Sequence, residues 1–418
     1  MKSVLYITYD GLSDPLGGSQ IIPYIIGLAA RGWVISILSC EKPERLKAHG
    51  TRIRAILGPA GVSWHPLAFH RFPPVAAKFW DQAMLIREAR RLHAKIPFSI
   101  VHCRSYVAME AGIRLKEDFG VRLLFDMRGF WVDERVEGGL WNLRNPFFLL
   151  AYAVYKRREK AFLRAADEIV ILTKKGKAEL SRWPAYGGVP ISVIPCAVDF
   201  ASFHLPLGTD RERALRELGI PGGAFVLLYL GSLGTWYMLD EMLAFFAALN
   251  AARPESVFLF LTPDPPETVL QAGRRRGVDP SALRIRATDR SELPALLAAA
   301  DAGISFIRPS YSKIASSPTK IGELLAVGLP IISNTGIGDI DVILPAVGGG
   351  ILIDNLTSSA FEAVLPGLRV ASTAEREEVR RKSREWYDLQ TAVVSYDRIY
   401  RNLAAVEGHP PAHPELPS

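Results

Sequence analysis

Thr319, Lys320 and Glu323 are spaced so that a hydroxyl, an ammonium and a carboxylate share one face of a helix. The surrounding sequence, SPTKIGE, predicts the start of that helix, because Ser317 suits the N-cap and Pro318 the first helical position. Free amides and the helix dipole favour an anion such as a diphosphate there, and a carboxylate one turn further can accept hydrogen bonds from a ribose diol. A surface helix with an ion pair between Lys320 and Glu323 is the alternative interpretation.

The pattern along the chain predicts the elements that must position these residues. Short β-rich runs alternate with helical stretches, which is typical of parallel sheets with crossover helices. We therefore expect an α/β fold with two Rossmann-like domains facing a central cleft, joined by a linker within residues 196–224. The expected strands are Ser3–Tyr9, Val34–Leu38, Ile100–His102, Arg122–Phe125, Glu168–Leu172 and Ile191–Ile194, then Phe225–Leu230, Val257–Leu261, Ala302–Ser305, Pro330–Ser333 and Gly350–Ile353.

Charged residues follow two of the expected strands in the first domain. Arg104 follows one strand, and Asp126, Arg128 and Glu134 follow the next. Because ligands bind at the carboxyl ends of parallel strands, we expect these side chains to face the cleft. Two interpretations stay open: Asp126 and Arg128 form a structural ion pair, or Arg128 binds a phosphate or an acidic ligand with Glu134 nearby. His102 is read either as a core histidine or as a neighbour of this edge.

Glycines mark a strand-to-helix loop in each half of the chain. Gly17 and Gly18 follow the first strand, and Gly231 and Gly234 follow the first strand of the second half. In the structural interpretation, these glycines allow a tight turn. In the functional interpretation, they let the backbone approach a phosphate or a sugar closely.

Four motifs, in order, resemble the retaining GT-B glycosyltransferases, in particular glycosyltransferase family 4. Together they span nearly the whole chain. The resemblance implies GT-B architecture, in which the terminal helix crosses back onto the first domain. We therefore expect an acceptor-side domain of residues 1–195 plus about 387–418, and a donor-binding domain of residues 196–386. The motifs are DPLGGS from Asp14, VIPCAVD from Val193, YLGSLG from Tyr229 and SPTKIGELLAVGLPIISNTGIGD from Ser317.

The resemblance also implies which residues hold a nucleotide-sugar donor. Glu323 is expected to hold the ribose, and backbone amides near Pro318 and Thr319 to approach the diphosphate. The full donor-side set is Gly231, Ser232, Gly234, Ser316, Ser317, Pro318, Thr319, Lys320 and Glu323, and the acceptor-side set is Gly17, Gly18, Arg104, Asp126, Arg128 and Glu134.

One departure from the family concerns charge beside the diphosphate. Many members carry an Arg and a Lys after the phosphate loop of the second domain, whereas here SLGTWY has no basic residue. We expect Lys320 and Arg308 to supply the charge instead, with Lys313 as a third candidate. Weakly assisted departure of the diphosphate is the alternative.

A second departure concerns the donor sugar. The family has two glutamates eight positions apart, and Ala315 stands at the earlier position. The identity of the sugar therefore cannot be carried over. Ser316 and Ser317 either contact the sugar or only cap the helix.

Composition limits the class of protein. A chain of 418 residues with 49% hydrophobic and 22% charged residues fits a globular protein of two domains. Cys40, Cys103 and Cys196 are odd in number and far apart, which indicates a reducing compartment, and no Cys/His cluster has zinc spacing. We expect no metal and no cofactor. The N-terminus lacks the features of a signal peptide and no apolar run is of membrane-spanning length, so we expect a cytoplasmic location.

The net charge of +7 is unevenly distributed. Residues 1–195 hold 29 Lys/Arg against 17 Asp/Glu, and the remainder holds 21 against 26. A basic first half favours anionic lipid or a phosphorylated acceptor, and no motif of a nucleic-acid module is present. Aromatic and basic residues interleave in residues 65–80 and 144–158, which suggests peripheral contact with an anionic membrane at its inner face. A buried helix face beside a solvated one is the alternative.

From the resemblance we expect a retaining glycosyltransferase. It would move a sugar from a nucleoside-diphosphate sugar to a saccharide or lipid-linked saccharide hydroxyl, in surface polysaccharide or lipopolysaccharide biosynthesis. The expected catalytic residues are Arg128, Lys320 and Arg308. The alternatives are a degenerate protein that binds a nucleotide or saccharide without turnover, and a GT-B nucleotide-sugar epimerase or phosphorylase.

Overall fold

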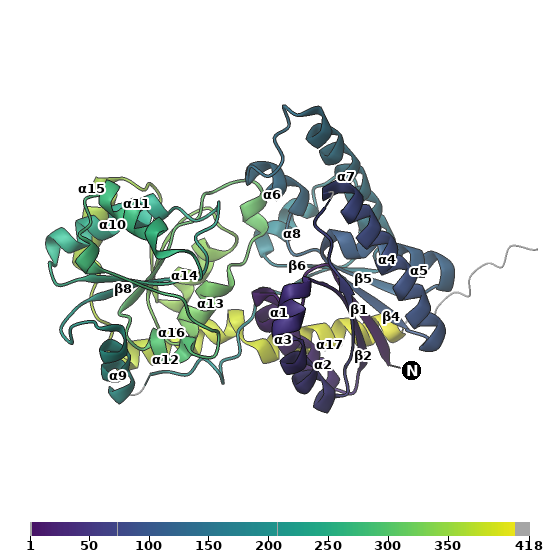
Figure 1. The fold of residues 1–418 in the computed structure, drawn as a ribbon, viewed down its shortest axis with the longest axis horizontal. Helices are drawn as coiled ribbons and strands as arrows, with labels where there is room; N and C mark the ends of the chain where they lie inside the picture. The colour runs from purple at the N-terminus through teal and green to yellow at the C-terminus, as the bar shows by residue number, and fades with distance from the viewer. Residues whose placement is uncertain (1, 73, 207, 406–418) are drawn as a thin grey trace, which may run out of the picture. The chain divides into compact units, whose positions relative to one another are not determined.

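The computed structural model describes residues 2–72, 74–206 and 208–405 and divides into two compact units. Unit 1 comprises the described residues of 1–136 and 140–195 and the helix that begins at Leu389. Unit 2 comprises residues 137–139 and 196–388. Each unit has a parallel sheet with helices on both of its faces (Figure 1). The predicted α/β fold class is therefore confirmed.

The sheet of unit 1 has the strand order β3-β2-β1-β4-β5-β6-β7. One strand of this sheet, β3, was not predicted. It contains Pro66 and is only partly buried, so it lacks the apolar run that marks the other strands. It pairs with β2 alone, and an edge strand tolerates a proline. The strands are β1 Ser3–Thr8, β2 Val34–Glu41, β3 Ser63–Ala68, β4 Ile100–Arg104, β5 Arg122–Asp126, β6 Glu168–Ile171 and β7 Ile191–Val193.

The sheet of unit 2 has the order β10-β9-β8-β11-β12-β13. Strand β10 was also missed, because its sequence LRIR is short and half charged, as suits an edge position. The predicted strands are all present. They are β8 Val226–Leu230, β9 Val257–Leu261, β10 Leu283–Arg286, β11 Ala302–Ser305, β12 Ile331–Asn334 and β13 Gly350–Ile353.

The continuous apolar strands follow from burial of both sheet faces. In β8, Val226 and Leu228 belong to one hydrophobic cluster, and Leu227 and Tyr229 belong to the cluster on the other face. Successive side chains of a strand point to opposite faces, so a strand covered on both sides needs apolar residues throughout.

The helices cover these faces. The linker expected within residues 196–224 contains helix α9, because Ala214 and Leu215 in ERALREL bury against unit 2. The helices are α1 Pro15–Gln20, α2 Ile22–Ala29, α3 Pro43–Leu57, α4 Pro74–Lys95, α5 Ser105–Phe119, α6 Trp131–Glu137, α7 Pro146–Ala165, α8 Lys174–Leu180, α9 Gly208–Leu218, α10 Leu239–Ala252, α11 Pro266–Arg275, α12 Leu293–Leu297, α13 Thr319–Ala326, α14 Ile340–Val347, α15 Ser358–Val364, α16 Thr373–Tyr387 and α17 Leu389–Ala405. None of the helices described is both long enough and apolar enough to span a bilayer.

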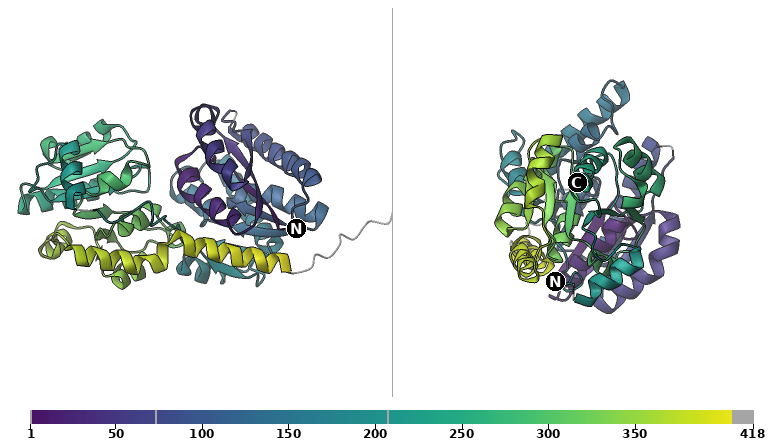
Figure 2. Two further views of the ribbon diagram at one scale, coloured as in Figure 1. Left: turned by 90° about the horizontal axis from the view of Figure 1, so that it is seen from below. Right: turned by 90° about the vertical axis from the view of Figure 1, so that its left-hand side faces the viewer.

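The last two helices pack on different units. Helix α16 contacts α13 and α14 in unit 2, whereas α17 contacts α2 and β4 in unit 1 and runs along that unit (Figure 2). Gly27 of α2 gives α17 its close approach, because an added Cβ would lie 2.7 Å from Val393. The indole N–H of Trp33 donates to Asp397 at 2.8 Å, and Arg401 pairs with the same carboxylate.

We predict that Asp397→Ala loosens α17 by about 1–3 kcal/mol, because it removes the acceptor for Trp33 and Arg401. Hydrogen exchange of α17 amides should accelerate, while α16 exchange, as the internal control, stays unchanged. Burial alone would raise the pKa of Asp397, but Trp33 and Arg401 hold that pKa below its usual value. The stabilisation is therefore present at neutral pH and lost as the pH falls below about 4. Unchanged α17 exchange in the variant would contradict this role.

Candidate functional site

Lys320 lies at the centre of the carboxyl edge of the unit 2 sheet. Its ammonium donates to the hydroxyl of Tyr229 at 2.9 Å and lies 3.5 Å from the centroid of the Tyr237 ring. The Tyr229 hydroxyl in turn donates to the carbonyl of Ser232 at 2.6 Å. Helix α13, strand β8 and the loop after β8 thus meet at one buried amine, which is 7% exposed.

Gly231 permits this arrangement. Its φ is +99°, in the region that favours glycine, and an added Cβ would lie 3.4 Å from the Lys320 Nζ. Gly234 also has a positive φ, of +24°. The carboxylate of Asp264 anchors the same loop by accepting from the Leu233 amide at 2.6 Å. The predicted glycine loop therefore packs directly against the predicted lysine.

Burial and two nearby carboxylates shift the pKa of Lys320 in opposite directions. Burial lowers the pKa of its ammonium well below the usual range, and Glu323 and Asp264 offset part of that effect. A buried amine with a depressed pKa becomes charged when an anion binds beside it. An anion bound beside Lys320 would therefore favour the charged form of this amine.

Glu323 lies one turn further along α13 and is paired with Arg290 rather than with Lys320. Burial raises the pKa of Glu323, while Arg290 and then Lys320 oppose that rise. The predicted alternative of a surface ion pair is wrong, because both Lys320 and Glu323 are buried. Arg290 was missed in the sequence, since it stands in a loop outside every motif.

The start of α13 differs from the prediction in its cap. The helix begins at Thr319 with Pro318 at the N-cap, and no side chain caps it. The Ser317 hydroxyl instead accepts from the Cys196 amide at 3.2 Å, so the N-cap role predicted for Ser317 is wrong. Ser316 ends the short helical turn before it. The first amides of α13 therefore have no side-chain cap from this segment.

Two further basic residues flank the aromatic ring of Trp236. The Arg308 guanidinium lies 5.0 Å from the ring centroid and donates to the Glu137 carbonyl of unit 2 at 2.6 Å. The Lys313 ammonium lies 3.8 Å from the same ring. The loop SLGTWY therefore has no basic residue of its own but holds an aromatic ring beside two cations from elsewhere in unit 2.

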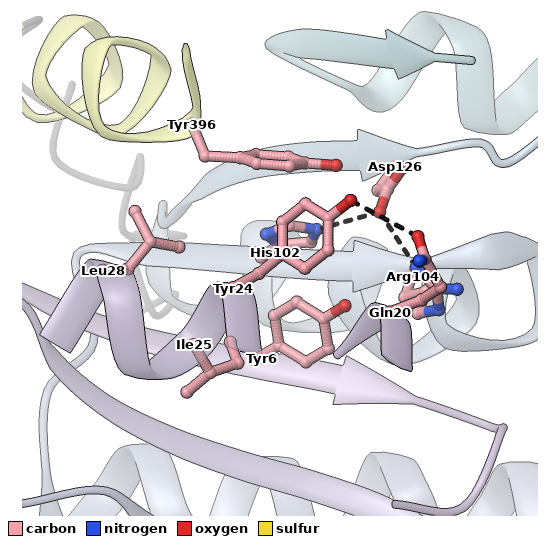
Figure 3. Close-up of a pocket in the computed structure, with 9 residues that line it drawn as sticks. All are labelled: Tyr6, Gln20, Tyr24, Ile25, Leu28, His102, Arg104, Asp126 and Tyr396. Atoms are coloured by element: carbon pink, nitrogen blue, oxygen red, sulfur yellow. Dashed lines mark hydrogen bonds and ion pairs between the residues drawn. The ribbon is translucent and has the colours of Figure 1, made fainter. Parts of the chain in front are cut away.

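The carboxyl edge of the unit 1 sheet has a second charged group. The Asp126 carboxylate is 3.6 Å from Arg104 and 3.5 Å from His102 (Figure 3). It is also 3.8 Å from Arg128. His102 bonds the Tyr400 hydroxyl through Nδ1 at 2.7 Å, as a core histidine does. The structure therefore brings Arg104, Asp126 and Arg128 together, and the predicted ion pair of Asp126 and Arg128 is present.

Asp126 holds this group together electrostatically. Burial alone would raise its pKa, but Arg128, His102 and Arg104 keep the pKa below its usual value. Nε of Arg104 and Oδ1 of Asp126 are buried and unbonded, beside a small cavity that Tyr6, Gln20 and Tyr396 help to line (Figure 3). The cavity is about the size of a water molecule, so the group is a packed polar network.

The first glycine pair is not in a loop as predicted. Gly17 and Gly18 lie within helix α1, which starts at Pro15 directly after the turn. An added Cβ on Gly17 would lie 2.2 Å from the Leu12 carbonyl, whereas nothing lies within 4 Å of one on Gly18. Close backbone packing therefore explains Gly17, and Gly18 faces open space. Glu134 is in α6, its amide bonded to the Phe130 carbonyl.

No group of three or more His, Cys, Asp and Glu side chains within the described ranges is placed to hold a metal ion. Cys40, Cys103 and Cys196 are all buried, and none of the three forms a disulfide within the described residues.

Arg128 has φ +58°, which strains a residue with a Cβ. We predict that Arg128→Gly is more stable than Arg128→Ala by about 1 kcal/mol, because glycine adopts this conformation without strain. Both variants lack the guanidinium, so their difference in chemical unfolding isolates the backbone effect. Equal stability of the two variants would show that the backbone relaxes there.

Comparison with known proteins identifies relatives of parts of the chain. A family model described as the glycosyl transferase 4-like domain matches residues 24–197. A D-inositol 3-phosphate glycosyltransferase of Catenulispora acidiphila is 24% identical over 254 residues, 58% of this chain and 56% of that protein. One of Kineococcus radiotolerans is 27% identical over 234 residues, 54% of this chain and 50% of that protein. The chain thus spans about half the length of the curated relatives it matches.

Solved structures share the fold over nearly the whole chain. Sucrose-phosphate synthase of Thermosynechococcus elongatus has a TM-score of 0.70 at 15% identity, covering 97% of this chain and 100% of that one. Anabaena HepE in complex with UDP-glucose has a TM-score of 0.69 at 12% identity, covering 96% and 99%. These structures confirm the predicted GT-B fold, and residues 24–197 resemble the glycosyl transferase 4-like domain.

Proposed function

We propose that this chain transfers a sugar from a nucleoside-diphosphate sugar to a hydroxyl of a saccharide or lipid-linked saccharide, with retention at the anomeric carbon. The observation that carries the proposal is the buried ammonium of Lys320 beside the Gly231–Gly234 loop and the first turn of α13. A diphosphate there receives a cation and free helix amides together. HepE is described in complex with UDP-glucose, so we take UDP as the nucleotide.

Each donor-side residue has a role in this proposal. Glu323 accepts hydrogen bonds from the ribose hydroxyls, and the amides of Thr319 and Lys320 bind the diphosphate. Lys320 replaces the basic pair that the loop after β8 lacks, and Arg308 adds a second cation. Ser316 is left for the sugar, since Ser317 is bonded to Cys196.

The acceptor-side proposal rests on the charged edge of unit 1. The partly exposed guanidinium of Arg128 lies at this edge, which favours an acceptor with a negative group. The curated relatives are named for D-inositol 3-phosphate, a polyol of that kind. We therefore include phosphorylated polyols and saccharides among the acceptors, with Gly18 and Glu134 at the edge of the same site.

The chemistry needs electrostatics more than an enzyme base. The bond between the anomeric carbon and the diphosphate breaks, and its electron pair goes to the diphosphate beside Lys320. The acceptor oxygen bonds to the same face of that carbon, and its proton goes to the leaving phosphate oxygen. Such a reaction belongs to the synthesis of surface polysaccharide or lipopolysaccharide on the cytoplasmic side of a membrane.

We predict that Glu323→Ala weakens UDP binding by about 1–3 kcal/mol, because the ribose loses its charged acceptor. Isothermal titration of UDP into the two proteins measures the change. Glu377→Ala is the matched control, since Glu377 is an exposed glutamate of the same unit.

Unchanged affinity in a folded Glu323→Ala variant would refute the ribose role. UDP binding without transfer or donor turnover would instead favour the degenerate binding protein that Ala315 suggests. Conversion of a nucleotide sugar without acceptor would favour an epimerase.

An exposed apolar surface of unit 1 supports contact with a membrane. Phe79 and Trp80 of α4 are 66% and 60% exposed, and Leu149 and Leu150 of α7 are 51% and 65% exposed. The two helices lie side by side, since the Lys78 ammonium is 4.8 Å from the centroid of the Tyr155 ring (Figure 1). Exposed Arg144, Arg157 and Lys160 on and beside α7 add positive charge. Aromatic and basic groups together suit an anionic bilayer surface.

We predict that Trp80→Ser with Leu150→Ser lowers binding to vesicles containing phosphatidylglycerol at least several-fold, because apolar area no longer enters the interface. Co-sedimentation measures the effect, with neutral phosphatidylcholine vesicles for comparison. Val342→Ser, at an exposed valine of unit 2, is the control. Equal sedimentation of all three proteins would contradict membrane contact through this surface.

A further inference from the structure

An imidazole and a buried carboxylate are paired at the carboxyl edge of the unit 1 sheet. His70 follows β3, and its Nδ1 lies 2.6 Å from Oδ1 of Asp81 on α4. The Asp81 side chain is fully buried, whereas the His70 side chain is 45% exposed. The pair therefore combines a fixed inner group with an accessible ring.

Asp81 is held by further bonds. Its Oδ2 accepts from the Tyr9 hydroxyl at 3.0 Å and from the His70 amide at 3.2 Å. Because a carboxylate can only accept, Nδ1 of the ring carries the proton. Nε2 of the neutral ring then has a free lone pair, and no hydrogen bond to it is found within the described part of unit 1.

The position of the pair matches that of the acceptor edge. Tyr9 directly follows β1, and the Phe69 amide before His70 bonds the carbonyl of Glu41 at the end of β2. The next residue after Tyr9, Asp10, lies 4.0 Å from Arg104. In open parallel sheets ligands bind outside these strand ends. The free Nε2 thus lies on the same edge as the charged group of Arg104, Asp126 and Arg128.

We propose that His70, oriented by Asp81, binds the acceptor by accepting a hydrogen bond at Nε2 from one of its hydroxyls. The inference rests on the proposed transfer reaction and adds a specificity residue to it. The hydroxyl bound by His70 differs from the reacting hydroxyl, whose proton goes to the leaving phosphate. Protonation of the ring converts Nε2 into a donor and removes this contact.

Two further titratable groups lie beside the pair of His70 and Asp81. Burial raises the pKa of the Tyr9 phenol and of the Cys40 thiol, so both stay neutral near pH 7. Charged groups nearby include Asp81, Glu41 and Asp10, which all act on Cys40, and an exposed pair of Arg71 and Glu44 at 3.8 Å.

The variant His70→Asn should keep the contact with Asp81, because the asparagine amide can still donate to that carboxylate. It lacks Nε2 and so loses the proposed contact with the acceptor. With UDP-glucose as donor and D-inositol 3-phosphate as acceptor probe, we expect the acceptor KM to rise about tenfold. The donor KM and kcat should stay within about twofold. His49→Asn, at an exposed histidine of α3, is the control.

An unchanged acceptor KM in His70→Asn, with normal transfer by the parent protein, would overturn the role of His70 alone. Absence of transfer by the parent protein to any acceptor would instead count against the proposed function. Nitrogen NMR of histidine-labelled protein decides the geometry without activity. We expect the Nδ1–H tautomer at His70, lost in Asp81→Asn; an Nε2–H tautomer would overturn the proposal.

Discussion

The carboxyl edge of unit 2 is organised around one buried amine. Lys320 reaches its position because α13 packs against β8, and because Gly231 has no side chain to occupy the same space. Burying an ammonium without a directly bonded carboxylate is costly, and tyrosine rings and a hydroxyl compensate only in part. A bound diphosphate would complete that compensation. In the proposed function, the same interaction would let a loop without Arg or Lys serve a nucleotide-sugar site.

In unit 1 the buried groups are acids instead of an amine. One buried carboxylate holds two arginines in place, and another holds an imidazole. Asp126 holds Arg104 and Arg128 beside β4 and β5, and Asp81 holds His70 beside β3, on the same carboxyl edge of the sheet. Both carboxylates are inaccessible, while Arg128 and His70 keep part of their side chains exposed. Buried carboxylates thus position partly exposed basic side chains at this edge of the sheet. Such an edge suits a hydroxylated, negatively charged ligand.

Much of the fold was predictable, because strands buried on both faces read as continuous apolar runs. The exceptions are β3 and β10, edge strands whose half-exposed sequences carry no such run. Helix α9 was read as a linker because proline and glycine stand on either side of it. The predicted N-cap at Ser317 failed because its hydroxyl bonds Cys196, a contact distant in sequence.

The candidate sites were predictable only where a motif marks them. Lys320, Glu323 and Arg128 stand in motifs or directly after strands. Arg290, His70 and Asp81 come from loops and helices that the fold alone brings to their partners. Such long-range pairs leave no spacing signal in one sequence, so only the folded structure shows them.

The most direct test of the central claim is the proton uptake that accompanies UDP binding. Titration calorimetry at pH 8 in buffers of different ionisation enthalpy measures it. Because burial lowers the pKa of Lys320 and a bound diphosphate would raise it again, we predict net proton uptake on UDP binding in the parent protein, lost together with affinity in Lys320→Met. UDP binding without proton uptake, at the same affinity in Lys320→Met, would contradict the account.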